Sequence, residues 1–328
     1  MKKPEKPEKP EISVIFPTYG RAGRLPGLLQ ALEGQTLSSD RFEVVVVDDC
    51  STDGTAAVIE KLGPGLRYRL RPLRTPVNGG PAAARNLGWR QAEAPLLAFL
   101  DDDCLPEPGW LEAGLAALTA QPGAGVIQGR THMTNLADQR KHAYGAPNWE
   151  VFHTIDHPTP FFESCNIFYR REVMEATGGF DEAIGWFGED TAAGWKALDA
   201  GWDRGFASEA VVTHPVERRG YRWFMRNGLL ERNIIGLASV HPGFRAEAFW
   251  RPWAYRKEDA AFKVAVLGAL LGLRFRPALL LVIPYVWWQR PSLRQRSFWR
   301  LCLQIPAVDA ARSLGQIRGA VAHRVKMV

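Results

Sequence analysis

Three consecutive carboxylates, Asp101, Asp102 and Asp103, directly follow a short apolar run at residues 96–100. The run has the pattern of a buried strand, and three acids at its end repel one another unless a cation or the hydroxyl groups of a ligand compensate their charge. Mg²⁺ and Mn²⁺ favour carboxylate oxygens and share their coordination shell with phosphates. The triplet therefore indicates a metal and phosphate site, although a solvated acidic loop is the simpler explanation of an Asp-rich turn taken alone.

A second acidic pair, Asp48 and Asp49, also ends an apolar run, at residues 42–47. Such runs alternate along the chain with segments of helical spacing, which is typical of an α/β fold with a mainly parallel sheet. Because ligands of these sheets bind beyond the carboxyl ends of the strands, we expect both acidic groups at one site. Strands are predicted at residues 12–16, 42–47, 66–70, 96–100, 125–129, 161–169 and 211–214, and helices at residues 25–32, 55–61, 81–92, 108–118, 170–176 and 191–200.

A glycine-containing loop at Asn78 and Gly79 precedes the helix predicted to start at Pro81. Glycines allow close approach of a ligand to the backbone, and the amino terminus of the helix favours an anion. Arg85 on the same helix then either faces the bound anion or is an ordinary surface arginine.

Six short motifs, each weak alone, stand between residues 12 and 215. They are PTY at residues 17–19, VDDCSTD at residues 47–53, NGG at residues 78–80 with ARN at residues 84–86, LDDD at residues 100–103, GGFD at residues 178–181 and GED at residues 188–190. As an ordered set they resemble the family 2 glycosyltransferases of GT-A fold. The resemblance implies a Rossmann-like α/β fold, with a mainly parallel sheet flanked by helices, and sugar transfer from a nucleotide diphosphate to an acceptor hydroxyl with inversion at the anomeric carbon.

The resemblance also assigns roles around the nucleotide donor. Asp103 matches the metal ligand of the family's D-x-D motif, which holds Mn²⁺ or Mg²⁺ against the diphosphate. Asp101 and Asp102 would face the ribose, the sugar or the water molecules of the metal. Asp49 matches the residue that accepts a hydrogen bond from the nucleotide base.

Other donor contacts are implied by the loops beside these acids. Pro17, Thr18 and Tyr19 would flank the base, and the Tyr19 ring can stack on it. The loop at residues 78–79 and the side chain of Arg85 would face the donor phosphates.

Glu189 and Asp190 match the family's E-D pair, in which the aspartate is the general base for the acceptor hydroxyl and the glutamate helps to position the acceptor. Asp190 also stands just before a predicted helix, and a role as its N-cap would lower its pKa and weaken it as a base. Trp186 and Phe187, immediately upstream, suit a sugar-stacking wall or belong to the core.

His214 ends the strand predicted at residues 211–214. A histidine near this place binds metal or phosphate in some GT-A enzymes, so His214 is a further candidate metal ligand beside Asp103 and Asp101. A lone histidine at a strand end is equally well explained as a polar surface residue.

Charge is distributed unevenly along the chain. Residues 251–328 contain 14 Lys and Arg but three acidic residues, a net charge of +11, whereas the whole chain has a formal charge of +6. Tryptophans lie among these arginines, and the composition predicts peripheral contact of residues 221–328 with an anionic membrane and no nucleic-acid binding. A helical cap that buries the tryptophans is the alternative. If residues 221–328 contact a membrane, the acceptor is expected to be a glycan or a lipid-linked saccharide.

Two apolar segments, at residues 264–273 and 278–288, are each shorter than the roughly 18 residues that a spanning helix needs. They predict two short helices that dip into an interface or pack on the body. The domain plan is a disordered leader at residues 1–11, a catalytic domain at residues 12–220 and a helical C-terminal region at residues 221–328.

The four cysteines form no C-x-x-C pair, which predicts free thiols in a reducing compartment. Together with the basic C-terminal region, this predicts a cytoplasmic protein on the inner face of the cell membrane.

Two other functions remain open at this point. A sugar nucleotidyltransferase has a phosphate loop that the sequence GRAGRLP at residues 20–26 loosely resembles, but it has no counterpart of Glu189 and Asp190. A non-catalytic scaffold would keep the fold and bind carbohydrate or membrane. The sequence does not choose between UDP, GDP and dTDP, and it does not define the sugar, the acceptor or the oligomeric state.

Overall fold

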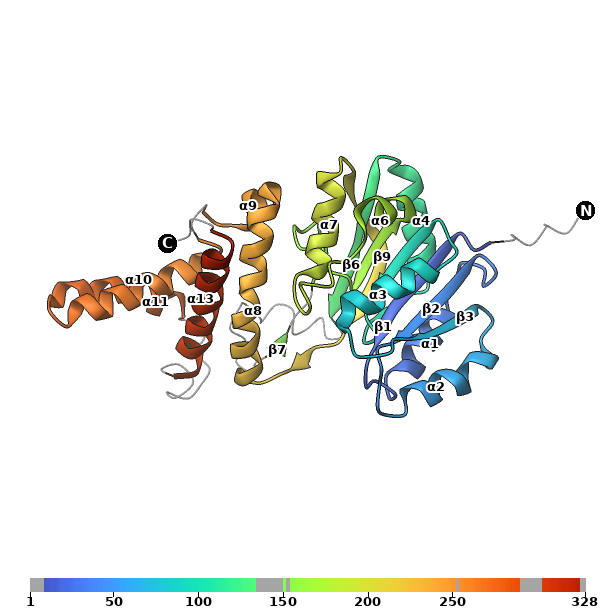
Figure 1. Ribbon diagram of the computed structural model, residues 1–328, viewed down its shortest axis with the longest axis horizontal. Coiled ribbons are helices and arrows are strands. Elements are labelled where there is room, and N and C mark those ends of the chain that lie inside the picture. Colours follow the sequence, from blue (N-terminus) through green and yellow to red (C-terminus); the bar gives the residue numbers. More distant parts are fainter. Residues whose placement is uncertain (1–8, 134–149, 152–153, 252–253, 290–302, 325–328) are drawn as a thin grey trace, which may run out of the picture. The chain divides into compact units, whose positions relative to one another are not determined.

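The computed structural model describes residues 9–133, 150–151, 154–251, 254–289 and 303–324 (Figure 1). The chain divides into two compact units. The first unit comprises Met1–Leu136 and His153–Pro215, and the second comprises Ala137–Phe152 and Val216–Val328. Most of the predicted leader lies outside the described residues, but Glu11 is held by a salt bridge to Arg41 with an oxygen–nitrogen distance of 2.6 Å.

An eight-stranded sheet in the order β3-β2-β1-β4-β8-β6-β9-β5 forms the centre of the first unit. The pairs β1–β2, β2–β3, β1–β4 and β6–β9 are parallel, and the pairs β4–β8, β6–β8 and β5–β9 are antiparallel. The predicted α/β fold with a mainly parallel sheet is therefore confirmed, with β8 inserted in the opposite direction. The strands are β1 Ile12–Thr18, β2 Phe42–Asp48, β3 Arg69–Arg74, β4 Leu96–Leu100, β5 Leu105–Pro106, β6 Ala124–Met133, β8 Asn166–Arg170 and β9 Asp203–His214.

Helices pack on the sheet because its strands are apolar on both faces. Ile12, Val14 and Phe16 of β1 are fully buried in a core with the apolar residues of α1 and α4. On the opposite face, α3 approaches β1 so closely that a Cβ at Gly88 would lie 2.6 Å from the Cγ2 atom of Ile15. The helices are α1 Leu25–Glu33, α2 Thr55–Leu62, η1 Gly63–Gly65, α3 Gly80–Gln91, α4 Trp110–Ala120, α6 Arg171–Thr177 and α7 Glu189–Asp199.

The prediction that Pro17 ends the first strand is wrong, because β1 continues to Thr18. Pairing of β1 with β4 stops at Ile15, whereas pairing with β2 continues to Thr18. The Thr18 carbonyl accepts a hydrogen bond on the β2 side, so the neighbouring Pro17 faces the side where the partner strand has ended. The missing N–H of Pro17 therefore costs no ladder hydrogen bond.

Four further predicted strands differ in their bounds by more than one residue. The strand predicted at residues 125–129 is the longer β6, Ala124–Met133. The strand predicted at residues 66–70 is β3, Arg69–Arg74, a half-exposed edge strand whose arginines hide its apolar pattern. The strand predicted at residues 161–169 begins only at Asn166, and the strand predicted at residues 211–214 is the end of the longer β9, which starts at Asp203.

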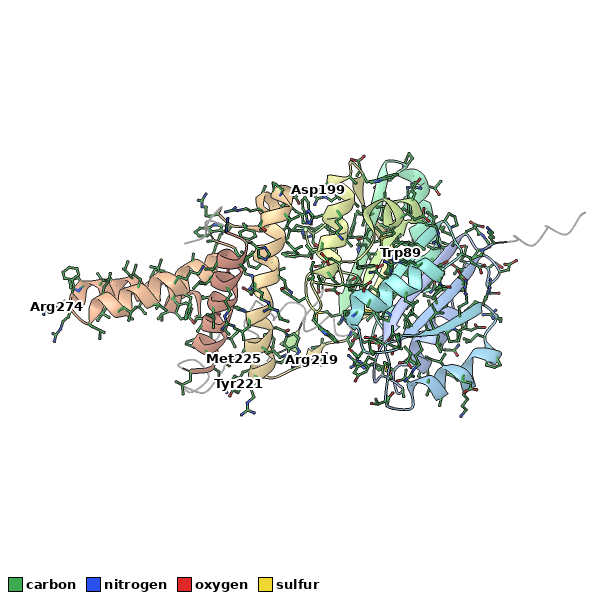
Figure 2. The ribbon with its side chains drawn as sticks, in the orientation of Figure 1. Trp89, Asp199, Arg219, Tyr221, Met225 and Arg274 are labelled. Carbon is green, nitrogen blue, oxygen red and sulfur yellow. The ribbon has the colours of Figure 1, made fainter. Side chains whose placement is uncertain are left out.

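The second unit is mainly helical (Figures 1 and 2). The two short apolar helices that the sequence predicted are confirmed as α10 and as η2 continued by α11. Among the described residues, no helix is both long enough and apolar enough to cross a membrane. The elements are β7 Glu150–Val151, β10 Glu217–Arg218, α8 Tyr221–Val240, α9 Pro242–Ala248, α10 Lys257–Gly272, η2 Arg276–Val282, α11 Ile283–Trp288 and α13 Ile305–Ala322.

A buried polar network joins α8, α10 and α13. Nε2 of Gln316 donates hydrogen bonds to carboxylate oxygens of Glu231 and Asp259, both at 2.8 Å, and the Arg256 guanidinium donates to Glu231 at 2.9 Å. Burial raises the pKa of Glu231 to about 7, although Arg256 opposes this shift. The network therefore contains a carboxylate that takes up a proton near neutral pH.

We expect the helical unit to lose stability as the pH rises from 5 to 8. The pKa of Glu231 is higher in the folded than in the unfolded chain, so its contribution is present at low pH and is lost as the pH rises to about 7. Glu231→Gln should remove about 1–3 kcal/mol of this pH dependence. Urea unfolding followed by circular dichroism at several pH values measures it. The exposed Glu247→Gln is the control, and an unchanged pH dependence in Glu231→Gln would contradict this assignment.

Candidate active site

The acidic triplet lies at the carboxyl end of β4, beside the end of β1. The Thr18 hydroxyl donates a hydrogen bond of 2.7 Å to Oδ2 of Asp102, which fixes the middle carboxylate against β1. Burial raises the pKa of Asp102 to about 6, while the hydrogen bond from Thr18 and the charge of Arg21 act in the opposite direction. Thr18 thus contacts the triplet directly, in addition to its predicted place beside the base.

Two arginines that the prediction did not include reach Asp103. Nη1 of Arg24 lies 3.0 Å from Oδ2 of Asp103, and Nη2 of Arg21 lies 3.8 Å from the same oxygen. Both belong to the GRAGRLP segment, which we connected only with the rival nucleotidyltransferase function. The resemblance to a phosphate loop was the signal that could have placed these arginines at the site.

His214 and Asp103 lie together, as the predicted metal site requires. Nε2 of His214 is 3.7 Å from Oδ1 of Asp103, and Nδ1 is 2.8 Å from the carbonyl oxygen of Pro215. A proton on Nδ1 satisfies that carbonyl and leaves the lone pair of Nε2 for a metal. The ligand atoms of Asp103, His214 and Cys104 lie within 4.8 Å of one another. Burial raises the pKa of the Cys104 thiol, so Asp103 and His214 are the donors that fit a divalent cation.

Arg85 joins the acidic triplet to the carboxylate pair. Its Nη2 donates to Oδ1 of Asp101 at 2.8 Å, and its Nη1 donates to Oε1 of Glu189 at 2.9 Å. Arg85 is 4% exposed, so it is not an ordinary surface arginine. The structure thus directs Asp101 to an arginine of the protein, not to the Asp103 and His214 group.

The GGFD motif is anchored to α3 through Asn86. The Asn86 side chain donates to the carbonyl oxygen of Phe180 at 2.9 Å and accepts from its backbone N–H at 3.0 Å. Gly179 has a φ of +76°, and a Cβ there would lie 2.7 Å from Nε1 of Trp89, which is labelled in Figure 2. This close packing places the loop that leads to Glu189.

Asp190 lies in the first turn of α7, which begins at Glu189 and not at Thr191 as predicted. Its Oδ1 accepts from the N–H of Thr191 at 2.7 Å, and its Oδ2 accepts from the N–H of Ser164 at 3.2 Å. The N-cap position is Gly188, so Asp190 is not the N-cap. Burial and the neighbouring Glu189 carboxylate raise the pKa of Asp190 well above its ordinary value, although Arg85 opposes them.

Asp49 holds the glycine loop in place. Its Oδ1 accepts hydrogen bonds from the Thr75 hydroxyl at 2.7 Å and from the Gly79 N–H at 3.0 Å, and its Oδ2 accepts from the Gly80 N–H at 2.8 Å. Asp49 is 4% exposed. Asn78, in the same loop, is exposed, and the contact of Asp49 with a nucleotide base stays a prediction.

Three aromatic side chains are exposed around this edge. Tyr19 is 46% exposed, Trp186 is 60% exposed and Phe187 is 42% exposed, so Trp186 and Phe187 are not part of the core. The Nε1 atom of Trp186 lies 3.7 Å from the position that a Cβ of Gly80 would occupy, which places the indole beside the loop held by Asp49. These rings can stack on a flat ligand surface.

The sequence profile of Glycosyl transferase family 2 matches residues 13–178. The chain belongs to this family. The glycosyltransferase AglE of Haloferax volcanii is 31% identical over 213 residues, which are 64% of the present chain and 68% of AglE. The validoxylamine A glucosyltransferase of Streptomyces hygroscopicus subsp. jinggangensis is 29% identical over 268 residues, which are 73% of the present chain and 63% of that enzyme.

Solved structures confirm the GT-A fold of this family 2 glycosyltransferase. The mannosyltransferase PcManGT of Pyrobaculum calidifontis, solved with GDP-Man and Mn²⁺, superposes with a TM-score of 0.66 and 24% identity. The match covers 96% of the present chain and 89% of PcManGT. Family membership favours glycosyl transfer over the nucleotidyltransferase alternative.

We expect Arg85→Gln to destabilise the first unit of this glycosyltransferase by about 3–5 kcal/mol, because it leaves the buried Glu189 carboxylate and the partly buried Asp101 carboxylate without their cation. Arg90→Gln is the matched control, since Arg90 is on the same helix but its side chain is 52% exposed. Urea unfolding followed by tryptophan fluorescence gives both values. A loss below about 1 kcal/mol in Arg85→Gln would show that this bridge is not needed for stability.

Proposed function

We propose that this family 2 enzyme is a metal-dependent, inverting glycosyltransferase that uses a nucleotide diphosphate sugar. The observation that carries the proposal is the bridge of Arg85 between Asp101 and Glu189, with hydrogen-bond distances of 2.8 and 2.9 Å. One buried side chain thereby joins the proposed donor side to the proposed acceptor side. An in-line displacement needs the donor and the acceptor to be held next to each other and aligned.

The donor side combines positive charge with a candidate metal pair. Asp103 and His214 would hold Mn²⁺ or Mg²⁺, and the bound ion would neutralise the departing diphosphate. Arg21 and Arg24 lie beside the same carboxylate and would bind phosphate oxygens of the donor.

The remaining donor contacts follow the family pattern. Pro17, Thr18 and Tyr19 would lie beside the nucleotide base, with Asp49 accepting its hydrogen bond and the exposed Tyr19 ring stacking on it. Asp102 would face the ribose or the sugar. The loop of Asn78 and Gly79 would approach the donor through its backbone.

Asp190 would act as the general base. Its carboxylate takes the proton of the acceptor hydroxyl while the hydroxyl oxygen forms a bond to the anomeric carbon, and the bond from that carbon to the diphosphate oxygen breaks on the opposite face. Burial and the charge of Glu189 raise the pKa of Asp190, which makes it a stronger base than an ordinary aspartate. Glu189 and the exposed Trp186 would position the acceptor.

We expect calorimetry to detect one of UDP, GDP and dTDP bound with Mn²⁺ and not with chelator. Asp103→Ala should abolish this binding, because the carboxylate that Nε2 of His214 faces is removed. Asp199→Ala, an exposed change at the end of α7, is the control and should bind like the wild type. Absence of binding in the wild type would favour the scaffold function, and pyrophosphate release from a sugar phosphate and a nucleoside triphosphate would favour the nucleotidyltransferase.

We expect Asp190→Asn to lower kcat by about 10²–10⁴ while nucleotide affinity is retained. Because the base must be ionised and its pKa is raised, kcat/KM of the wild type should increase with pH above the ordinary carboxylate range. Proton NMR of the product anomer tests inversion. Loss of nucleotide binding in Asp190→Asn, or a retained anomer, would contradict the assignment.

We further propose that the acceptor is a glycan or a lipid-linked saccharide of the cell envelope. The support is the net charge of +11 over residues 251–328 together with the tryptophans in this region. The enzyme would work in the cytoplasm, at the inner face of the cell membrane, in peripheral contact through residues 221–328.

A further inference from the structure

The apolar arm, residues 262–287, exposes a large hydrophobic surface. It consists of most of α10, the turn after it, η2 and nearly all of α11. Thirteen large apolar side chains of the arm are exposed. Soluble proteins rarely expose contiguous apolar patches above a few hundred Å² without a function. The exposed residues are Val264, Val266, Leu267, Leu270, Leu271, Leu273, Phe275, Leu279, Leu280, Leu281, Ile283, Val286 and Trp287.

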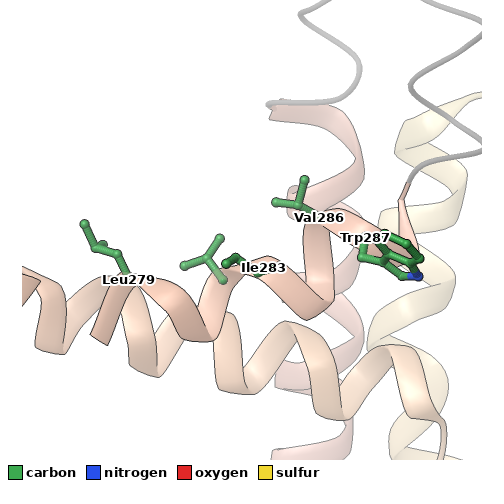
Figure 3. Close-up of a pocket in the computed structure, with 5 residues that line it drawn as sticks. Leu279, Ile283, Val286 and Trp287 are labelled. Atoms are coloured by element: carbon green, nitrogen blue, oxygen red, sulfur yellow. The ribbon is translucent and has the colours of Figure 1, made fainter. Parts of the chain in front are cut away.

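The arm has two legs, α10 as the first and η2 with α11 as the second. The two legs already pack on each other, so the exposed surface is additional to the interface between them. A Cβ at Gly268 would lie 2.6 Å from Cβ of Leu281, and a Cβ at Gly272 would lie 2.4 Å from Cδ2 of Leu279. The glycines on one side of α10 thus allow the second leg to pack closely against this helix. Figure 3 shows Leu279, Ile283, Val286 and Trp287 on η2 and α11, where they line an apolar pocket of about 470 Å³. Apolar side chains therefore cover the outer side of both legs.

The positive charge of the arm indicates the chemistry of its binding partner. Residues 262–287 contain the basic Lys263, Arg274 and Arg276 and no Asp or Glu. Arg274 and Arg276 flank the exposed Phe275 in the turn, and Figure 2 shows Arg274 at the free end of the arm. An anionic lipid surface complements this combination of apolar and cationic side chains. A second copy of the arm offers no acidic side chain to pair with these arginines.

The arm is too short to span a bilayer. Each leg of about 12 residues is about 18 Å long, compared with about 30 Å for the hydrocarbon core. The root of the arm, where it joins α8 and α13, is held by polar contacts. The Tyr285 hydroxyl donates a hydrogen bond to Asp309 at 2.7 Å, and Gln316 links Asp259 to α8. Trp287 lies near this root, and tryptophan favours the boundary between lipid and water.

We propose that the apolar arm lies flat in the interface of one leaflet of an anionic membrane, with its apolar side chains buried among the lipids and Arg274 and Arg276 bound to lipid phosphates. The inference deepens the proposed peripheral location and rests on no step of sugar transfer. Binding of the full chain to vesicles therefore tests it separately from activity, so an inactive chain that binds vesicles fails only the proposed function.

Flotation of the full chain with vesicles of phosphatidylcholine and 30% phosphatidylglycerol tests the proposal. We expect Leu270→Glu with Leu280→Glu to lower the vesicle-bound fraction at least tenfold, since these residues are 62% and 65% exposed. Val240→Glu with Val321→Glu is the matched control, because these valines are 65% and 75% exposed on α8 and α13, outside the arm. The control should bind like the wild type, and circular dichroism confirms that both variants fold.

Two further measurements define the lipid chemistry. Vesicles of phosphatidylcholine alone, or the double substitution Arg274→Gln with Arg276→Gln, should reduce binding at least fivefold. Brominated lipids should quench less fluorescence in Trp287→Phe than in the wild type. A folded wild type that binds no vesicle, or an arm variant that binds like the wild type, overturns the proposal. A wild-type dimer that the arm variant converts to monomer, without vesicle binding, would instead assign the arm to contact between copies.

Discussion

The organisation of the first unit depends on compensating the negative charge gathered at one edge of its sheet. Asp101, Asp102 and Asp103 follow β4, and Glu189 and Asp190 open α7, so carboxylates from distant parts of the chain converge. Arg85 is buried between two of them, and only its fixed position on α3 makes this possible. The close packing of α3 on β1, which requires Gly88, is therefore an electrostatic requirement as well as a packing one.

The carboxylates have different neighbouring groups, and these neighbours give them different chemical properties. Asp103 faces Arg21 and Arg24, which stabilise its charge, whereas Asp190 is desolvated beside Glu189, which makes ionisation costly. The first environment suits a ligand of cations, and the second suits a base that accepts a proton. Two groups of the same residue type are thus adapted to different roles by their surroundings.

Much of this arrangement could be predicted, because parallel strands that are buried on both faces leave apolar runs and their carboxyl ends meet at one edge. The residues 96–100 strand was predicted with its exact bounds, and the motif order identified the family. Polar contacts across the fold could not be predicted. The role of Asp49 in holding Gly79 and Gly80 leaves no local pattern, since it joins residues from separate loops.

The helical unit shows the same division between polar and apolar interactions. Gly315 and Gly319 of α13 let it approach the backbone of α8 closely, and the buried side chains of Gln316 and Glu231 hydrogen-bond across this contact. Because a buried polar pair tolerates few alternative alignments, it fixes the register of the helices. The apolar side chains of α10 impose no such register, since they surround the helix. The polar contacts at the root therefore orient the arm but do not cover its outer part. The exposed apolar surface of the arm can then interact with a nonpolar environment.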